Sequence, residues 1–424
     1  MSHQPDRIYA SYHVETAFPL ETALATMAGE QSSGTFLALP GETAELRERS
    51  GARIELIQEK EQVSQPSLPG AAHPKGVAAP RWIRAEAVLS WPLDNLGPSL
   101  PNLLATVAGN LFELQQFSAL RLLDLTLPEA FRDAYAGPQF GIEGTRSLTG
   151  VHGRPLIGTI VKPSVGLSPS ETAGLVRELV DGDIDFIKDD ELQADGPRCP
   201  FADRVAAVMP VIHDHAARTG RRVMYAFNLT GEIDQMLARH DLVERAGGTC
   251  VMVSLHSIGL PGLAYLRRHC RLAIHAHRNG WGLFQRSPHI GISYVAWQKL
   301  WRLAGADHMH VNGLRNKFCE DDASVLASAR ECLKPMFPRP GRGCEVMPVF
   351  SSGQTVRQAH TTFAALGTVD LIHAAGGGLI AHPGGIAAGV RAMRQAWEAA
   401  TSGIPLEDHA ATHPELRQAL EKYA

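Results

Sequence analysis

A lysine lies directly before three acidic residues in the run Lys188-Asp189-Asp190-Glu191, which follows an apolar stretch. If that stretch is a strand, Lys188 and Asp190 face the same side and Glu191 lies at the turn that follows. Two carboxylates at this spacing suit a hard Mg²⁺ ion. An ammonium group cannot bind a metal, but a lysine that loses its proton and adds CO₂ becomes an anionic carbamate. The run therefore predicts a Mg²⁺ site, with a lysine–carboxylate ion-pair cluster as the alternative.

Two further lysines are candidates for proton transfer. Lys162 directly precedes Pro163 at the end of an apolar run, and Lys317 lies in a glycine-containing segment seven residues after His310. A lysine desolvated near a metal has a lowered pKa and can exchange a proton with the carbon of an enolate. We expect Lys162 to have that role and Lys317 to act as a mobile cation. The alternative for each is a solvated surface charge.

Other apolar runs end in residues that could bind anions. Gly376 to Gly378 and Ser351 to Gly353 fall where loops after the last two strands of a barrel commonly hold phosphate, although a tight turn also explains the glycines. His275 and His277 share one face of a predicted strand, and a buried histidine pair is the alternative to a functional role. Arg278 follows them, and its planar guanidinium can bind a carboxylate or a second phosphate.

The elements that position these residues alternate in a regular way from Pro155 onward. Short apolar runs, separated by stretches with helical periodicity, occur eight times within about 250 residues, which favours a (β/α)₈ TIM barrel over an open sheet. The runs are Leu156–Val161, Ile184–Lys188, Val223–Asn228, Cys250–Leu255, Leu272–His277, His308–Val311, Val346–Phe350 and Leu371–Ala375. Because chemistry in such barrels collects where the strands end, the candidate residues should lie at one mouth.

The first 130 or so residues have a different pattern, which predicts a separate α+β domain of the ferredoxin-like kind. The expected strands are Arg7–Val14, Ala52–Ile57, Trp82–Ser90 and Ala119–Leu127, and the expected helices are Pro19–Gly29 and Asn102–Phe117. The proline- and glycine-rich segment 62–80 cannot form a helix interior and is expected to be a mobile loop. Clustered glycines place the boundary near 130–150, which gives domains 1–135 and 145–424.

Composition excludes several classes of protein. The 424 residues carry 40 Lys and Arg against 44 Asp and Glu, a net charge of −4, so no nucleic-acid partner is expected. No apolar stretch approaches the 18 or so residues of a membrane span, and the N-terminus lacks an apolar signal core, which favours a cytoplasmic protein without a membrane partner. The six cysteines are scattered and predict neither disulfides nor zinc.

Several of these motifs resemble the large subunit of ribulose-bisphosphate carboxylase (RuBisCO). The run Asp185 to Glu191 resembles the family's active-site signature, Gly158 to Pro163 its first barrel strand, and Ile274 to Arg278 its fifth. His310 and Lys317 keep the family's separation between the sixth-strand histidine and the mobile-loop lysine. The agreement extends over most of the chain.

The resemblance implies a role for each matching residue. Lys188 would be carbamylated by CO₂ and would bind one Mg²⁺ ion together with Asp190 and Glu191. The implied catalytic residues are Lys162, Lys188, Lys317, His277 and Asn110, and the implied substrate-binding residues are Glu30, Thr35, Arg278, His310, Ser351, Gly353, Gly376 and Gly377. The segment from Glu30 to Phe36 resembles one that reaches into the partner subunit's active site, so a homodimer or higher homo-oligomer with shared sites is implied.

The chain also departs from the family's pattern. Ser164 replaces the second lysine after the first strand, and Ile160, Trp281 and Phe36 replace a threonine, a histidine and a tryptophan. Ser352 and Gln354 interrupt a Ser-Gly-Gly-Ile stretch. CO₂ fixation is therefore not expected, and the chain resembles the RuBisCO-like (type IV) proteins, which keep the enolising residues but serve another substrate.

The segment from His310 to Phe318 is most similar to the branch that acts on 3-oxo-isoapionate 4-phosphate in D-apionate breakdown. The expected activity is the decarboxylase, which gives erythrulose phosphate and CO₂ through an enediolate. The alternatives are a transcarboxylase/hydrolase that gives glycolate and 3-phosphoglycerate, and an enolase or isomerase of the methylthioribulose-phosphate type. A non-catalytic binding protein is a third class, against which the complete set of acid, base and metal-binding groups speaks.

Overall fold

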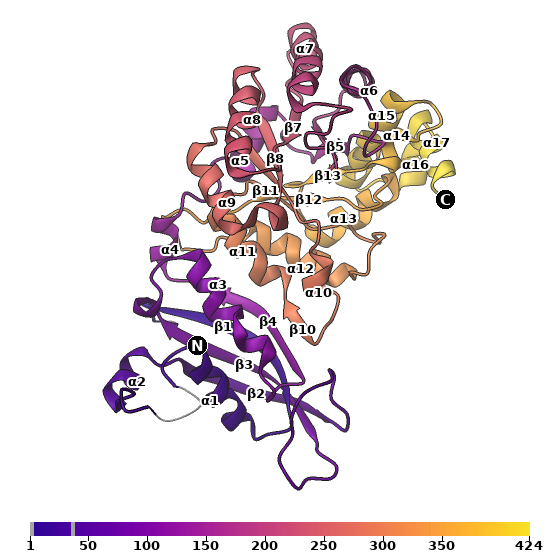
Figure 1. Ribbon diagram of the computed structural model, residues 1–424. Coiled ribbons are helices and arrows are strands. Elements are labelled where there is room, and N and C mark those ends of the chain that lie inside the picture. The colour runs from indigo at the N-terminus through magenta and orange to yellow at the C-terminus, as the bar shows by residue number, and fades with distance from the viewer. Residues whose placement is uncertain (1–3, 35–38, 339) are drawn as a thin grey trace. The chain divides into compact units, whose positions relative to one another are not determined.

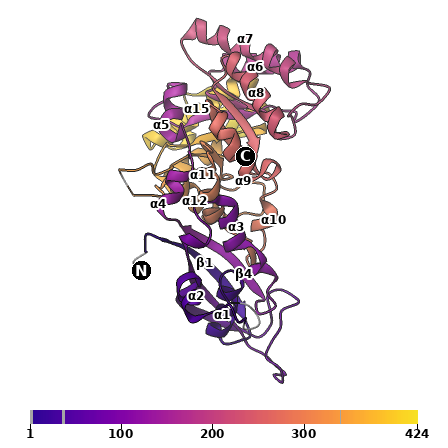
Figure 2. The same ribbon diagram turned by 60° about the vertical axis from the view of Figure 1, so that its left-hand side comes forward.

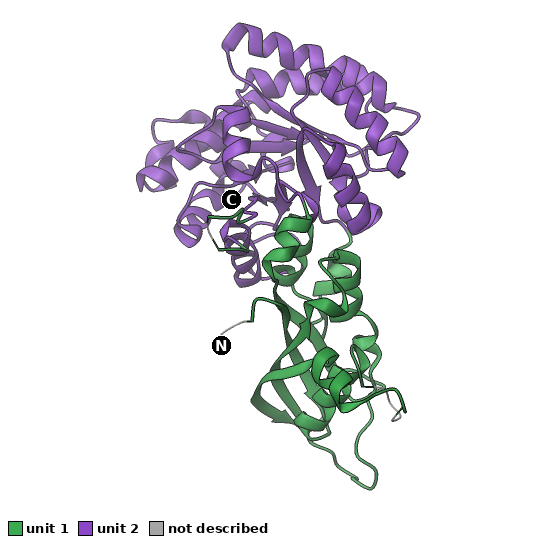
Figure 3. Ribbon diagram, turned by 90° about the vertical axis from the view of Figure 1, so that its left-hand side faces the viewer, with its two compact units in different colours: residues 1–135, 280–303, 336–343 green, residues 136–279, 304–335, 344–424 purple. Residues whose placement is uncertain are grey.

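The computed structural model describes all residues except 1–3, 35–38 and 339. The chain divides into two compact units, coloured separately in Figure 3. Unit 1 contains residues 1–135, 280–303 and 336–343, and unit 2 contains residues 136–279, 304–335 and 344–424. Nothing in the sequence pattern indicated that two segments from within the barrel half of the chain belong to unit 1.

Unit 2 contains a closed barrel of eight parallel strands, which confirms the predicted TIM barrel (Figure 1). Each predicted apolar run contains one strand, and the structure shortens most runs by one or two residues at an end. The strands are β5 (Leu156–Ile160), β6 (Phe186–Lys188), β7 (Met224–Asn228), β8 (Cys250–Ser254), β9 (Ala273–His277), β11 (His308–His310), β12 (Met347–Phe350) and β13 (Ile372–Ala374). Nearly every strand residue is buried, as expected for a parallel sheet covered on both faces.

Helices follow the strands and surround the barrel. They are α5 (Gly141–Thr149), α6 (Pro169–Asp181), α7 (Phe201–Thr219), α8 (Ile233–Arg245), α9 (Leu255–His269), α12 (Asp322–Leu333), α13 (Ala359–Leu366), α14 (Gly377–Ile380), α15 (Ile386–Ser402), α16 (Leu406–Ala410) and α17 (Pro414–Lys422), with a 3₁₀ turn at Val356–Gln358. The helices α6, α7 and α8 lie next to one another (Figure 2). The start of α6 is encoded locally: Ser168 and Glu171 form a reciprocal capping box, and Pro169 occupies the first helical position.

Unit 1 is built on a five-stranded sheet in the order β10-β4-β1-β3-β2, and its α+β character confirms the prediction. Its strands are β1 (Arg7–Thr16), β2 (Arg53–Val63), β3 (Trp82–Pro92), β4 (Ala119–Thr126) and the late strand β10 (Ile290–Ile292), which pairs parallel to β4. Its helices are α1 (Leu20–Glu30), α2 (Ala44–Ser50), α3 (Leu100–Ala108), α4 (Glu129–Ala134), α10 (Gly282–Gln285) and α11 (Tyr294–Ala304), with 3₁₀ turns at Leu93–Asn95 and Asn110–Glu113.

The predicted helix over residues 102–117 was wrong in its second half. Helix α3 ends at Ala108 because Gly109 adopts φ −75° and ψ −120°, which is not helical, and only a 3₁₀ turn follows. The segment between β2 and β3 contains neither helix nor strand, in agreement with its proline and glycine content. In the described residues, we find no helix with the length and apolar character that a bilayer span needs.

A buried histidine makes the stability of unit 2 depend on pH. His373 of β13 is fully buried beside the Trp397 ring, and burial lowers its pKa to about 4. As the pH falls through about 6.5, the unfolded chain takes up a proton at this residue and the folded chain does not. We expect the free energy of unfolding to fall by about 2–3 kcal/mol through this residue between pH 7 and pH 4.5.

This loss can be measured by urea unfolding at both pH values. His373→Leu should reduce the difference between the two free energies by that amount, whereas His152→Leu, a change at an exposed histidine of the same unit, should not. Equal pH dependence of the wild type and the His373→Leu variant would contradict the prediction.

Candidate active site

The candidate residues of unit 2 lie where its barrel strands end. Lys188 is the last residue of β6, and its register neighbours are Ile160 of β5 and Ala226 of β7. Lys162 follows β5, and His277 is the last residue of β9. Because the strands are parallel and closed into a barrel, these ends meet at a single mouth.

Two lysines and two carboxylates form one cluster at this mouth. The Lys162 Nζ donates to Asp190 Oδ2 at 2.6 Å, and the Lys188 Nζ lies 3.5 Å from Glu191 Oε2. The Lys188 amine also donates to the Asp189 carbonyl at 2.9 Å. The ion pairs that the sequence allowed as an alternative are thus present, and they bring together the groups that a metal site would use.

Burial shapes the charges in this cluster. Lys188 is fully buried, and burial lowers the pKa of its ammonium group, which eases the loss of the proton that must precede addition of CO₂. Burial acts to raise the pKa of the Glu191 carboxyl, but the nearby His277 ring and the amino groups of Lys188 and Lys162 hold it below its usual value. Glu191 therefore stays ionised at neutral pH.

Asp189, between the candidate ligands, points away from the cluster and anchors the strand end. Its carboxylate pairs with Arg204 at 3.1 Å and accepts hydrogen bonds from the Tyr225 hydroxyl at 2.6 Å and from the Asn228 backbone N–H at 2.9 Å. The Asn228 side chain donates to the carbonyls of Asp190 and Glu191, at 3.3 Å each. These bonds hold the backbone that carries both candidate metal ligands.

Arg204, Tyr225 and Asn228 were not among the predicted site residues. Asn228 was visible as a polar residue at the end of the third barrel strand, but its contact with the second strand depends on strand order in space. Arg204 lies on α7. In the sequence it is an arginine among apolar residues of a helix, and nothing there indicates that its side chain is buried against Asp189.

Three histidines lie beside the cluster. The Nε2 atoms of His275 and His310 are 2.7 Å apart, His310 Nδ1 lies 3.0 Å from the Ser351 hydroxyl, and His277 Nε2 lies 3.4 Å from Glu191 Oε2. Burial lowers the pKa of all three rings, that of His277 to about 4. They are neutral at pH 7 and offer hydrogen bonds without charge. The buried pair foreseen for His275 and His277 is instead a pair of His275 with His310.

Arg278 forms an ion pair that the sequence did not indicate. Its guanidinium contacts the carboxylate of Glu320, which also accepts a hydrogen bond from Asn312 Nδ2 at 2.6 Å. Glu320 comes from the loop between β11 and α12. No periodicity in that loop distinguishes Glu320 from the neighbouring acidic residues.

The glycine segments and the loop lysine lie around the same mouth. Gly376 precedes α14, and a Cβ atom placed on it would lie 3.8 Å from the Lys162 Cε, so the two residues are adjacent. Gly353 has φ +84° and lies beside the Lys317 side chain. The backbone N–H of Lys317 donates a hydrogen bond to the Ser352 carbonyl at 3.2 Å. Lys317 itself is exposed, with its Nζ 5.3 Å from the centre of the Phe318 ring.

The remaining predicted residues belong to unit 1 or are not described. Glu30 ends α1, and Asn110 begins the 3₁₀ turn after α3. Thr35 and Phe36 lie outside the described residues. These positions stay predictions that rest on the resemblance.

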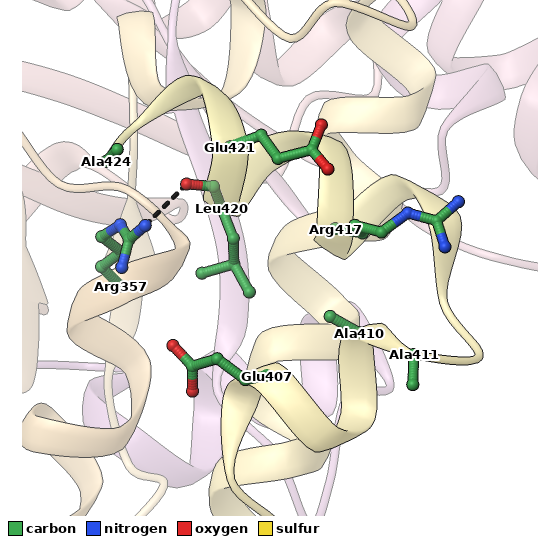
Figure 4. Close-up of a pocket in the computed structure, with 8 residues that line it drawn as sticks. All are labelled: Arg357, Glu407, Ala410, Ala411, Arg417, Leu420, Glu421 and Ala424. Atoms are coloured by element: carbon green, nitrogen blue, oxygen red, sulfur yellow. Dashed lines mark hydrogen bonds between the residues drawn. The ribbon is translucent and has the colours of Figure 1, made fainter.

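A separate hollow lies at the C-terminal helices α16 and α17 (Figure 4). The Arg357 guanidinium closes one side of it by donating to the Leu420 carbonyl at 2.6 Å. Its lining residues are Arg357, Glu407, Ala410, Ala411, Arg417, Leu420, Glu421 and Ala424. None of them is a predicted site residue, so the strand ends remain the candidate active site.

This chain belongs to the RuBisCO large-chain family, and its fold is that family's. Residues 141–423 match the model of the ribulose bisphosphate carboxylase large chain catalytic domain, and residues 2–131 match that of its N-terminal domain. These matches confirm the family that the motifs indicated.

Two curated proteins and one solved structure are similar to this chain over nearly its whole length. The chain is 59% identical over 415 residues to a 3-oxo-isoapionate-4-phosphate transcarboxylase/hydrolase of Xanthobacter autotrophicus, which covers 98% of this chain and 99% of that one. It is 44% identical over 419 residues to a 3-oxo-isoapionate-4-phosphate decarboxylase of Rhizobium etli, with 98% and 99% covered. Among solved structures, a rubisco-like protein from Burkholderia fungorum has a TM-score of 0.91 and 46% identity, with 98% and 99% covered.

Proposed function

We propose that this chain is a Mg²⁺-dependent enzyme that cleaves a carbon–carbon bond of 3-oxo-isoapionate 4-phosphate. The observation that carries the proposal is the cluster of Lys162, Lys188, Asp190 and Glu191 at the barrel mouth, in a chain so similar to proteins named for that substrate. The 59% identity favours the transcarboxylase/hydrolase as the first activity to test. The decarboxylase, which the sequence motifs favoured, is the second, and the 44% identity supports it.

The donor set fits a magnesium ion. Asp190 and Glu191 supply carboxylate oxygens, which are the ligands that Mg²⁺ prefers, and a carbamate on Lys188 would add a third anionic oxygen donor. The carbamate forms when the neutral amine bonds to the carbon of CO₂ and releases a proton. When bound, Mg²⁺ would supply Lewis-acid polarisation of the substrate's keto oxygen.

The residues of this chain would then bind and orient the substrate. The Gly376–Gly377 and Gly353 backbone would hold its phosphate, and the neighbouring subunit's Thr35 would complete this binding group. Lys317 would close over the bound substrate and exclude water. His277, neutral at pH 7, would donate a hydrogen bond to one of its hydroxyl groups, and His310 would act through the Ser351 hydroxyl that it contacts.

Both proposed activities begin with the same bond. The bond between the carboxylate carbon and its neighbour breaks, CO₂ leaves, and the electron pair remains on the substrate as an enediolate. In the decarboxylase, Lys162 then protonates the carbon, which gives erythrulose phosphate. In the transcarboxylase/hydrolase, CO₂ bonds to the adjacent carbon, and water cleaves the product into glycolate and 3-phosphoglycerate.

The products decide between the two activities. We expect purified protein with Mg²⁺, bicarbonate and 3-oxo-isoapionate 4-phosphate to give glycolate and 3-phosphoglycerate in equal amounts without net CO₂. Erythrulose phosphate with one equivalent of CO₂ would assign the decarboxylase. A substrate recovered unchanged would contradict the proposed function, and conversion of a methylthioribulose phosphate instead would assign an isomerase.

We also propose that the working form is a homodimer or a larger homo-oligomer. Two solved relatives are described as a dimeric and an octameric RuBisCO. Glu30, Thr35 and Asn110 would then complete the site of the neighbouring subunit. Light scattering that gives the mass of a single chain at working concentration would contradict this.

A further inference from the structure

The ion pair between Arg278 and Glu320 places a carboxylate of the chain where an anionic group of a ligand would otherwise bind. Arg278 directly follows β9 at the barrel mouth. The side chains are only 7% and 6% exposed, so both charges are largely withdrawn from water. A guanidinium in such a position binds carboxylate or phosphate strongly through charge-assisted hydrogen bonds.

The carboxylate of Glu320 is held on several sides. In addition to Arg278, it accepts hydrogen bonds from Asn312 Nδ2 at 2.6 Å and from the Ser324 hydroxyl at 2.9 Å. The Asn312 amide oxygen in turn accepts a hydrogen bond from the Ser352 hydroxyl at 2.8 Å. Arg278, Asn312 and Ser324, which come from three different segments, therefore hold the two carboxylate oxygens of Glu320 in place.

The backbone at Asn312 is adapted to this arrangement. Its φ is +65°, in the left-handed region that asparagine tolerates better than most residues. This conformation lets one side chain reach Glu320 and Ser352 together. A larger or β-branched residue here would be strained and would lose both contacts.

Three described residues on the same side of the mouth, His310, Ser351 and Ser352, offer no positive charge to a second phosphate. His310 is neutral, because burial lowers its pKa well below the usual value, and Ser351 and Ser352 are uncharged. A phosphate dianion beside Arg278 would have to displace Glu320 or lie against its carboxylate. An uncharged hydroxyl group of a substrate can lie beside Arg278 without displacing Glu320 and without being repelled by its carboxylate.

We propose that Glu320 is a specificity-determining residue that occupies Arg278 and restricts the active site to substrates with a single phosphate. This inference rests on the proposed function, because it takes the substrate to be a sugar acid with one phosphate. Because Glu320 neutralises Arg278, the site can keep this arginine and still accept the uncharged, hydroxyl-bearing end of the substrate beside it.

Binding of two probes tests the proposal without turnover. Ribitol 5-phosphate and ribitol 1,5-bisphosphate are titrated into the intact protein by calorimetry, with Mg²⁺ and bicarbonate present. We expect the wild type to bind the monophosphate at least about threefold more tightly than the bisphosphate, because a second phosphate would lie against the Glu320 carboxylate. In Glu320→Gln, which keeps the size of the side chain, the bisphosphate should bind at least about tenfold more tightly than the monophosphate, because Arg278 is released.

Matched variants exclude other causes. Arg278→Gln combined with Glu320→Gln should abolish the preference, and Glu407→Gln, which removes an exposed carboxylate on α16, should leave the wild-type ratio unchanged. A wild type that binds the bisphosphate as tightly as the monophosphate or more tightly, or an unchanged ratio in a folded Glu320→Gln, overturns the proposal. If Glu320→Gln does not fold, the wild-type ratio alone decides.

The outcome is distinguishable from a failure of the proposed function. Absence of the expected products with an unchanged pattern of probe binding rejects the reaction and leaves the role of Glu320 standing. Absence of binding of both probes to the wild type and to Glu320→Gln rejects the role of Glu320, whatever the products are.

Discussion

Replacing Lys188 with alanine should lower kcat/KM by about three orders of magnitude, the factor that several kcal/mol of transition-state stabilisation represents. Lys188 is the one group of the cluster that can become a third anionic ligand, and its full burial lowers the pKa of the amine that must react with CO₂. Without it, Asp190 and Glu191 alone would have to hold the metal. The loss should therefore appear together with weaker Mg²⁺ binding.

Three measurements separate this effect from misfolding. Circular dichroism reports whether Lys188→Ala folds, a Mg²⁺ titration of activity gives the change in metal affinity, and ¹³C NMR with labelled bicarbonate reports the carbamate. Lys334→Ala, at an exposed lysine after α12, is the matched control and should behave as the wild type. A folded Lys188→Ala with more than a tenth of wild-type activity would refute the carbamate role, as would turnover that is indifferent to chelators.

Replacing Lys162 with methionine should have the second largest effect and should lower activity without weakening the binding of Mg²⁺. General acid–base groups contribute about 10²–10⁴-fold to rates, so product formation should fall by that factor. The Lys162 ammonium now lies 2.6 Å from Asp190 Oδ2, where it competes with a cation for the carboxylate. Its removal should leave Mg²⁺ affinity unchanged or increase it.

Solvent deuterium identifies the step that is lost. If the protein is the decarboxylase and Lys162 delivers the proton to carbon, the wild type incorporates deuterium from D₂O into the product. Lys162→Met then forms little of that product, although CO₂ release in a single turnover persists. A variant that loses Mg²⁺ binding together with activity would instead show that Lys162 maintains the metal site. Unchanged product formation would exclude Lys162 as the acid.

Much of the barrel could be predicted because its information is local. A strand buried on both faces requires a continuous apolar run, and a helix around the barrel requires an apolar stripe, so eight alternations define the architecture. The helix predicted over residues 102–117 was too long for a reason that is also local. Gly109 takes a backbone conformation that ends the helix, and the spacing of the apolar residues around it does not show this.

Within the site, the sequence by itself determined which residue types stand at the strand ends, and from them the prediction of a magnesium site. Lys188, Asp190 and Glu191 are neighbours in the chain, at the end of β6 and just beyond it, so no contact between distant segments is needed to place them together. The position of Lys162 against Asp190 required only that adjacent parallel strands share one end.

Only the tertiary structure decided the partners that come from distant segments. Asp189 turns toward Arg204 and Tyr225, His275 pairs with His310, and Arg278 is neutralised by Glu320. These contacts join residues between 15 and 42 positions apart, which no local period links. Hydrogen bonds and ion pairs have a reach of a few ångströms, so they exist only once closure of the barrel has brought its strand ends to a common mouth.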